Sequence, residues 1–400
     1  MDRRQFLTAA LASGAGLALG PAVWRAAIAD PILTATDGPY GPLLAPDANG
    51  VRLPAGFTSK VIARSEQVVA GTAYVWHHAP DGGATFPTQD GGWIYVSNSE
   101  VPSATGGGAS AIRFAADGTI VDAYRILAGT SLNCAGGAVG REWLSCEEHE
   151  GGLVWRCDPT KPGTGTPLPA LGTFAHEAVA ADRDGRLYLT EDEPDGLFYR
   201  FTPAVPGNFS AGTLEAAKWL PSGHVEWLAV PRPNLVPGTT ATRHQVPGAT
   251  VFRGGEGCYY HDAAARGGVV YITTKGDNRV WAYKPAQRLL EVVYDAGTIA
   301  NAPLRGVDNV TVTQSGDVVV AEDGDDLQIC VLSGTTVYPL LQVVGHERSE
   351  IAGPAFSPDG TRLYFSSQRG PAIATAPFED GAGQANPVRP GVTFEVTGPF

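Results

Sequence analysis

A pattern of about 45 residues is repeated six times in this chain, and it limits the folds that the chain can adopt. In each copy an apolar strand ends in polar residues, a glycine-rich turn follows, and a second strand returns. The six apolar strands lie at 93–100, 143–148, 187–192, 270–275, 318–323 and 363–368. A single unit of this kind cannot bury both of its faces, so neighbouring units must stack on one another.

Short strands at this spacing are typical of the blades of a β-propeller. The composition agrees, because 51 glycines, 31 prolines and one methionine describe a chain that is rich in turns. The six repeats predict an all-β fold with six blades, in which a strand at 392–396 closes the ring. A β-sandwich or a two-domain β protein is the competing fold, and neither accounts for the repeat.

The sequence divides into an N-terminal signal and a single propeller domain. Arg3 and Arg4 precede a weakly apolar run, and the segment 27–29 has the small-residue pattern of a cleavage site. We therefore expect residues 1–29 to be a signal peptide of the twin-arginine route, and the mature protein to be periplasmic or extracellular. Residues 30–400 then form the propeller, with an insertion at about 204–250 that does not fit the repeat.

Charge and hydropathy exclude two classes of partner. No later run approaches the roughly 20 apolar residues of a membrane span, so we expect no stable span after removal of the signal. The net charge of −13 argues against binding to nucleic acid, because contacts to phosphates need basic patches. An acidic protein can still bind an anionic substrate if metal ions supply the positive charge.

Acidic residues recur in register in these repeats. The segment from Glu177 to Glu191 has the same length and layout as the segment from Asp308 to Glu322. In a propeller the first strand of each blade lines the axial channel, so the residues that start these strands meet at one mouth of the channel. Those residues include His77, His78, Cys134, Glu177, Glu256, Asp308 and Glu350.

Carboxylates that converge in a narrow channel repel one another unless a cation is bound. Oxygen ligands suit calcium, and a thiolate among carboxylates suits a transition metal such as iron. The sequence therefore predicts a metal site at the mouth of the axial channel. The alternative is that these acids are turn residues or solvated charges at strand ends. Recurrence in register favours the metal site for Glu177, Glu256 and Asp308.

Other side chains near these strands have two interpretations each. Cys134 is a thiol at a strand start, whereas most of the five cysteines are expected to be small core residues. The sequence has no C-x-x-C pair, which argues against a structural zinc site, and a bond between Cys146 and Cys157 stays open. Arg253 either binds a phosphate or carboxylate or forms a structural salt bridge. His77, His78 and His176 are either ligands or acid/base groups, or they are packing residues.

Taken in order, these motifs resemble the PhoX-type alkaline phosphatases from about Arg52 to Gln368. The motifs are Asn133-Cys-Ala-Gly-Gly137, Trp143-Leu-Ser-Cys-Glu-Glu148, His176-Glu177, Leu189 to Phe201, Glu256-Gly257, Asp308-Asn309, Glu322-Asp323-Gly324 and Glu350 to Gly360. The resemblance implies a six-bladed propeller that holds a cluster of ferric iron and calcium (Fe3+ and Ca2+). It implies hydrolysis of phosphate monoesters, and sometimes diesters, outside the cytoplasm. The partner is then a small phosphorylated substrate, and we expect a monomer.

The resemblance also assigns roles to residues. The metal ligands that it implies are Cys134, Glu148, Glu177 and Glu256, with Asp308, Glu322 and Glu350 as further calcium candidates. Arg253 and Glu256 are the candidate catalytic residues, and Arg253 and His176 are the candidate contacts to the substrate.

The chain departs from this family in its phosphate-binding motif. The arginine that stands two residues before the glutamate in better-known members stands three before Glu256 here, and Gly254 takes the matching position. This pattern indicates a shorter, divergent member. Two further hypotheses stay open. One is a calcium-dependent propeller lactonase, which should not need Cys134, and the other is a non-catalytic binding propeller that is stabilised by metal.

Overall fold

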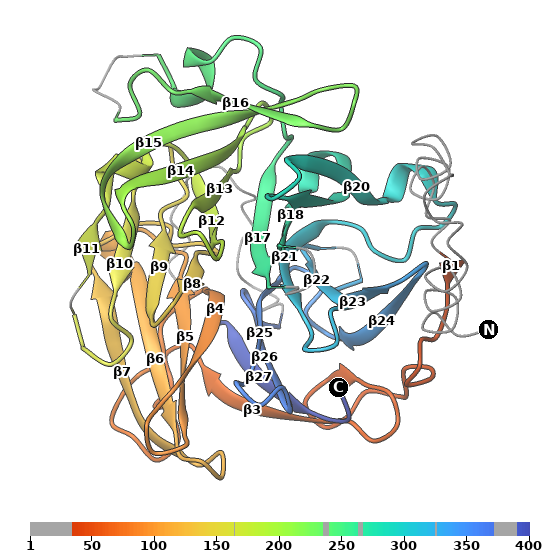
Figure 1. Ribbon diagram of the computed structural model, residues 1–400. Helices are drawn as coiled ribbons and strands as arrows, with labels where there is room; N and C mark the ends of the chain where they lie inside the picture. The colour runs from red at the N-terminus through yellow and green to blue at the C-terminus, as the bar shows by residue number, and fades with distance from the viewer. Residues whose placement is uncertain (1–33, 164, 235–239, 263–266, 325, 372–389) are drawn as a thin grey trace.

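In the computed structural model, six β-sheets lie around a common axis (Figure 1). The structure describes residues 34–163, 165–234, 240–262, 267–324, 326–371 and 390–400. The predicted signal peptide, residues 1–29, lies outside the described residues. The six sheets confirm the predicted all-β propeller with six blades.

Blades 1 to 5 are built from consecutive strands, and the first strand of each blade lies nearest the axis (Figure 1). Their strands are β4 (Pro80–Pro87), β5 (Trp93–Ser99), β6 (Gly108–Phe114) and β7 (Ile120–Ala128); β8 (Gly137–Val139), β9 (Glu142–Cys146), β10 (Val154–Cys157) and β11 (Thr166–Pro167); β12 (His176–Ala181), β13 (Leu187–Glu191), β14 (Phe198–Val205), β15 (Asn208–Trp219) and β16 (Val225–Ala229); β17 (Gly255–His261), β18 (Val269–Thr274), β19 (Arg279–Lys284) and β20 (Leu289–Asp295); and β21 (Val307–Val312), β22 (Val318–Glu322), β23 (Gln328–Ser333) and β24 (Thr336–Val343).

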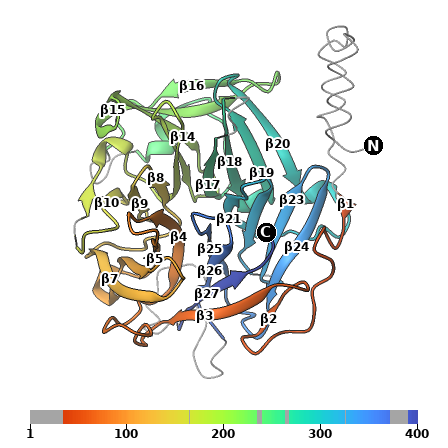
Figure 2. The same ribbon diagram turned by 60° about the horizontal axis from the view of Figure 1, so that its bottom comes forward.

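Blade 6 joins the two ends of the chain. Its strands are β25 (Ile351–Phe356), β26 (Arg362–Ser367), β27 (Val392–Thr397) and β3 (Thr58–Arg64). β27 lies between β26 and the N-terminal strand β3, where Phe394 is the register partner of Val61 (Figure 2). The predicted ring-closing strand is therefore present. The short strands β1 (Thr34–Ala35) and β2 (Val51–Arg52) pair with β24 at the edge of blade 5.

Residues of the predicted insertion at 204–250 extend blade 3. β15 is the fourth strand of that sheet, and β16 adds a fifth strand at its outer edge. The chain then returns through the 3-10 helix η4 (Thr242–Gln245) to the loop that follows β13. There the Arg243 guanidinium pairs with Glu191 at 3.3 Å and with Asp195 at 2.8 Å.

Side chains that alternate along each strand fill the spaces on both sides of a blade. In β13, Leu189 packs into the core that blade 3 shares with blade 2, whereas Tyr188 packs into the core that it shares with blade 4. The Tyr188 ring lies 5.6 Å from that of Tyr283 in blade 4, and both residues are fully buried. Each large buried side chain contributes about 1.5–3 kcal/mol, which is why these strands are apolar along their length.

The inner strands approach one another closely around the axis. A Cβ atom at Gly82 would lie 1.8 Å from the carbonyl oxygen of Ala135, so only glycine allows blades 1 and 2 to meet there. The inner strands of all six blades line a cavity of about 470 Å³, and Gly82 and Ala135 also contribute to its lining. None of the helices in the described part of the chain has the length and apolar character that crossing a lipid bilayer requires.

Candidate metal centre

The strand register places corresponding residues of blades 1 to 5 at one mouth of the channel. In blade 3, His176 at the start of β12 pairs with Glu191 at the end of β13, and in blade 5 Val307 pairs with Glu322 in the same way. Each of these blades has such a pair, formed by one residue at the start of the first strand and one at the end of the second strand. The residues that directly follow the first-strand member of the pair are here called the inner set: Asp81, Cys134, Glu177, Glu256 and Asp308. The residues that directly follow the second-strand member of the pair are here called the outer set: Glu100, Glu148, Asp192, Lys275 and Asp323.

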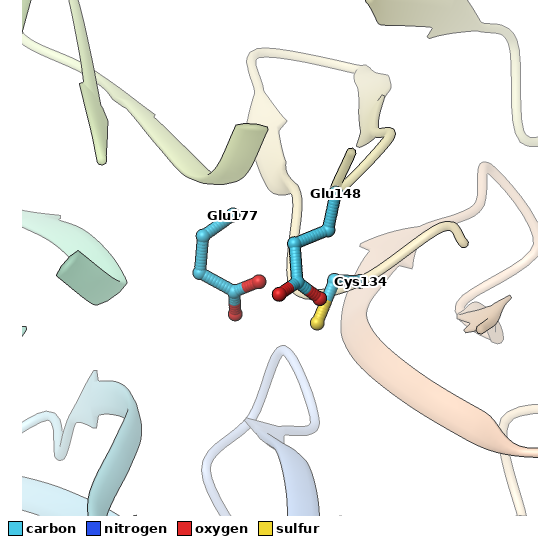
Figure 3. A group of neighbouring side chains, drawn as sticks. All are labelled: Cys134, Glu148 and Glu177. Carbon is cyan, nitrogen blue, oxygen red and sulfur yellow. The ribbon is translucent and has the colours of Figure 1, made fainter. Parts of the chain in front are cut away.

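Members of the two sets meet in two groups that share Glu177. Ligand atoms of Cys134, Glu148 and Glu177 all lie within 4.8 Å of one another, and Figure 3 shows the Glu148 carboxylate and the Cys134 sulfur side by side, with the Glu177 carboxylate pointing toward them. Carboxylate oxygens of Glu177, Glu256 and Asp308 form a second group within the same limit. The predicted ligands Cys134, Glu148, Glu177, Glu256 and Asp308 are therefore brought together.

Glu177 combines full burial with a carboxylate that lacks hydrogen-bond partners among the described residues. An ionised carboxylate in such a place costs several kcal/mol unless a cation neutralises it. The donors around Glu177 therefore fit a metal ion, with one thiol beside carboxylates on one side and carboxylates alone on the other.

The raised pKa values of the buried acids at the mouth also fit a site that binds a cation. Burial, and then the neighbouring Glu256 carboxylate, raise the pKa of Glu177 well above its usual value, and the same two causes act on the pKa of Asp308. Burial also raises the pKa of Glu256 to about 8, although the Lys275 ammonium opposes this. The Cys134 thiol has a raised pKa because it is buried beside Asp81. Metal binding would compete with protons for all of these ligand atoms.

A third acidic group contains Glu350, which was predicted from the sequence, and Asp81, which was not. Oxygens of Asp81, Glu100 and Glu350 lie within 4.8 Å of one another. The Gln368 amide donates to Asp81 at 2.8 Å and also to Glu100. Blade 1 starts at Pro80 and not at the expected His77, so Asp81 takes the inner-set position. The pair Asp81-Gly82 resembles Glu256-Gly257, and this similarity was the available signal.

Two cations at the mouth were also missed by the sequence analysis. The Lys275 ammonium lies 2.7 Å from Glu256 and 3.2 Å from Asp323. The Arg369 guanidinium lies 2.6 Å from Glu350. Both follow second strands, at positions where the repeat predicts acidic residues.

Three predicted residues lie outside the acidic groups. The Glu322 carboxylate accepts hydrogen bonds from the backbone N–H groups of Arg305 and Gln328, both at 2.9 Å, and so braces blade 5. His176 is fully buried, donates from Nε2 to the carbonyl of Gly172 at 3.1 Å and packs against Phe174.

Arg253 is the third of these residues, and it is exposed. Its carbonyl accepts a hydrogen bond from the N–H of Gly276 at 3.0 Å, next to Lys275. The Arg253 side chain is therefore open to solvent at the edge of the mouth. The cysteines are all free and buried, which leaves Cys146 and Cys157 unbonded.

Residues 149–370 match the family described as alkaline phosphatase PhoX. No curated protein matches the sequence. Among solved structures, PhoX of Pseudomonas fluorescens in complex with vanadate, a transition-state analogue, is similar with a TM-score of 0.68 and 15% identity over 92% of this chain and 98% of that one. A Bacteroides thetaiotaomicron protein of unknown function has a TM-score of 0.49 and 10% identity over 85% of this chain and 76% of its own. The PQQ domain of Coprinopsis cinerea pyranose dehydrogenase has a TM-score of 0.49 and 11% identity, with 88% and 98% covered.

Proposed function

Because the chain belongs to the PhoX family of alkaline phosphatases, we propose that it hydrolyses phosphate monoesters at a centre of iron and calcium. One observation carries the proposal: the buried carboxylate of Glu177 has no partner among the described residues and faces a thiol on one side and carboxylates on the other. A second support is the vanadate that the Pseudomonas fluorescens PhoX structure holds as a transition-state analogue.

The donor set suggests how two kinds of metal would be divided. Cys134 and Glu148 would hold iron, because a thiolate favours a transition metal, and Glu256 and Asp308 would hold calcium, which prefers oxygen. Glu177 lies in both groups and would be shared between them. When bound, the metal ions would act as Lewis acids toward the phosphoryl oxygens.

The chain's own cations would complete the anion site. Arg253 is exposed beside the turn that carries Lys275, and a guanidinium in this place would bind a phosphate oxygen through its paired N–H donors. We therefore keep Arg253 as the candidate substrate contact. We withdraw His176 from that role, because its buried ring points into the packing of blade 3.

The proposal is tested by measuring metal content and turnover on the same sample. The protein is produced in a host that exports folded proteins, its iron and calcium are determined by elemental analysis, and hydrolysis of p-nitrophenyl phosphate is followed before and after chelation. We expect both metals and a turnover that chelation abolishes. Calcium alone without turnover would exclude the phosphatase and favour a lactonase or a binding propeller.

Variants separate the centre from the fold. Cys134→Ala should lose iron and turnover together, because it removes the thiol of the mixed group. Cys330→Ala is the matched control, since it removes another buried thiol, which lies in the apolar core of blade 5 away from the acidic groups. If both variants keep their iron, the assignment of Cys134 is wrong.

We also propose export by the twin-arginine route, from the paired Arg3 and Arg4 ahead of an apolar run. Replacement of both arginines by lysine should leave the protein in the cytoplasmic fraction with its signal uncleaved. Periplasmic recovery of that variant would show that another route is used.

A further inference from the structure

Lys275 is the one basic residue among the ten positions of the inner and outer sets. In blades 1, 2, 3 and 5 the outer-set position holds a carboxylate, and in blade 4 it holds this lysine, directly after Thr274, the register partner of Gly255. The change is therefore a replacement of charge at a fixed place in the fold and not a shift of register.

The Lys275 ammonium is surrounded as a bound cation would be. It lies 2.7 Å from Glu256 of its own blade, 3.2 Å from Asp323 of blade 5 and 3.9 Å from Asp192 of blade 3. Carboxylate oxygens supplied by three neighbouring blades are the ligands that a divalent cation such as calcium prefers. Here an ammonium lies among them instead: it donates a hydrogen bond to Asp323 and forms ion pairs with Glu256 and Asp192.

This environment lies at the rim of the mouth, where the Lys275 side chain is 36% exposed and Glu256 reaches into the buried part. Glu256 is 2% exposed, and it also belongs to the group that contains the unpartnered Glu177. One carboxylate thus lies between the proposed metal centre and the ammonium. An ammonium carries one charge where calcium carries two, and it is tethered to the chain and cannot be removed by a chelator.

We infer that the Lys275 ammonium takes the place of a divalent cation between Glu256, Asp192 and Asp323, and that it excludes a metal ion from this position. A lysine side chain therefore supplies one of the positive charges at the mouth, where a metal ion would otherwise bind. The inference extends the proposed metal centre, but it does not depend on phosphatase turnover.

The test counts metal ions and does not use activity. Wild type and variants are dialysed against the same calcium buffer, and the bound calcium per chain is measured by elemental analysis. Lys275→Glu restores the residue type of the other blades and should bind one calcium ion more than wild type. Lys275→Met removes the charge but keeps an unbranched side chain, and it should also bind one calcium ion more than wild type. After chelation of calcium, this variant should unfold at a lower temperature than chelated wild type. Lys275→Arg keeps a cation and should match wild type.

Lys218→Glu is the control, because Lys218 pairs with Glu226 at 3.0 Å and both side chains are exposed on blade 3, away from the mouth. Equal calcium in wild type, Lys275→Glu and Lys275→Met overturns the inference, and so does a gain in Lys275→Arg. If Lys275→Glu does not fold, Lys275→Met decides. A wild type without any metal would instead contradict the proposed centre, so the two failures are distinguishable.

Discussion

Adjacent acidic residues of this propeller have opposite surroundings. Glu147 accepts hydrogen bonds from the Trp155 indole at 2.9 Å and from the N–H of Ser131 at 2.8 Å, so its charge is satisfied inside the blade. Glu148, the next residue, points into the mouth beside Cys134. Successive side chains of a strand point to opposite sides, and this alternation separates a structural acid from a candidate ligand.

The buried acids of the mouth make the stability of the metal-free protein depend on pH. Burial raises the pKa of Asp81 from 3.8 to about 6 and that of Glu256 from 4.5 to about 8, so the folded state holds protons that the unfolded state releases at lower pH. The free energy of unfolding should therefore fall as pH rises from about 4.5 to about 8, by up to about 1.4 kcal/mol per pH unit for each such proton.

Urea unfolding of chelated protein between pH 5 and pH 8 measures this slope. Glu256→Gln removes one of the titrating groups and should make the slope smaller, and saturating calcium should flatten it because metal replaces the protons. Stability that rises over this range in the absence of metal would contradict the assignment of these groups.

At the scale of the strand, the last residue of β13 and that of β22 serve as braces. Glu191 accepts from the N–H of Leu197 at 3.1 Å and from the hydroxyl of Tyr199 at 2.7 Å, and so holds β13 to the start of β14. Glu322 holds β22 to the start of β23 through the N–H of Gln328. Each brace fixes the end of a strand next to the mouth.

Removing one brace should cost stability without removing metal. Glu322→Ala leaves the N–H groups of Arg305 and Gln328 without their acceptor, and each unsatisfied group costs about 1–3 kcal/mol. We expect the free energy of unfolding to fall by roughly 2–6 kcal/mol in urea, with metal content per folded chain unchanged. Loss of calcium in folded Glu322→Ala would restore the ligand role that the sequence predicted.

The same strands show how far the sequence could be interpreted. The second strands were predictable, because their apolar runs end in polar residues at a regular spacing, and Glu177 and Asp308 followed from the frame that they share. Asp81 was not found, because the first strand of blade 1 was expected to start at His77, and only the pairing of Pro80 with Ser99 shows that it starts later. Lys275 and Arg369 were overlooked because a repeat of carboxylates predicts an acid at such positions, and only the pairing of strands shows what replaces it.

At the scale of the whole molecule, the mouth links blades that otherwise contact only their neighbours. Cys134, Glu177, Glu256 and Asp308 come from blades 2, 3, 4 and 5, so a metal centre among them would act across most of the ring. A ligand present at 100 times its dissociation constant stabilises the folded state by about 2.7 kcal/mol.

Chelation should therefore lower the melting temperature of the entire propeller in one transition. Differential scanning calorimetry of metal-loaded and chelated protein measures the shift, and addition of metal should reverse it. A separate early transition in the chelated protein would mean that the centre stabilises only the blades nearest to it.

Closure of the ring is the second property of the whole molecule, and it depends on β27. This strand connects the C-terminal β26 to the N-terminal β3, and its residues Val392, Phe394 and Val396 are at most 1% exposed. Burial of three such side chains contributes roughly 5–9 kcal/mol, which is comparable to the total stability of a typical domain.

A chain that ends before β27 should therefore fail to close. Truncation after residue 390 leaves β26 and β3 as unpaired strand edges, and such edges promote association between chains. We expect aggregation or a loss of cooperative unfolding. Deletion of residues 34–52, which removes the short strands β1 and β2 at the edge of blade 5, should cost much less stability. A truncated protein that stays monomeric and melts at the wild-type temperature would show that five complete blades hold the ring by themselves.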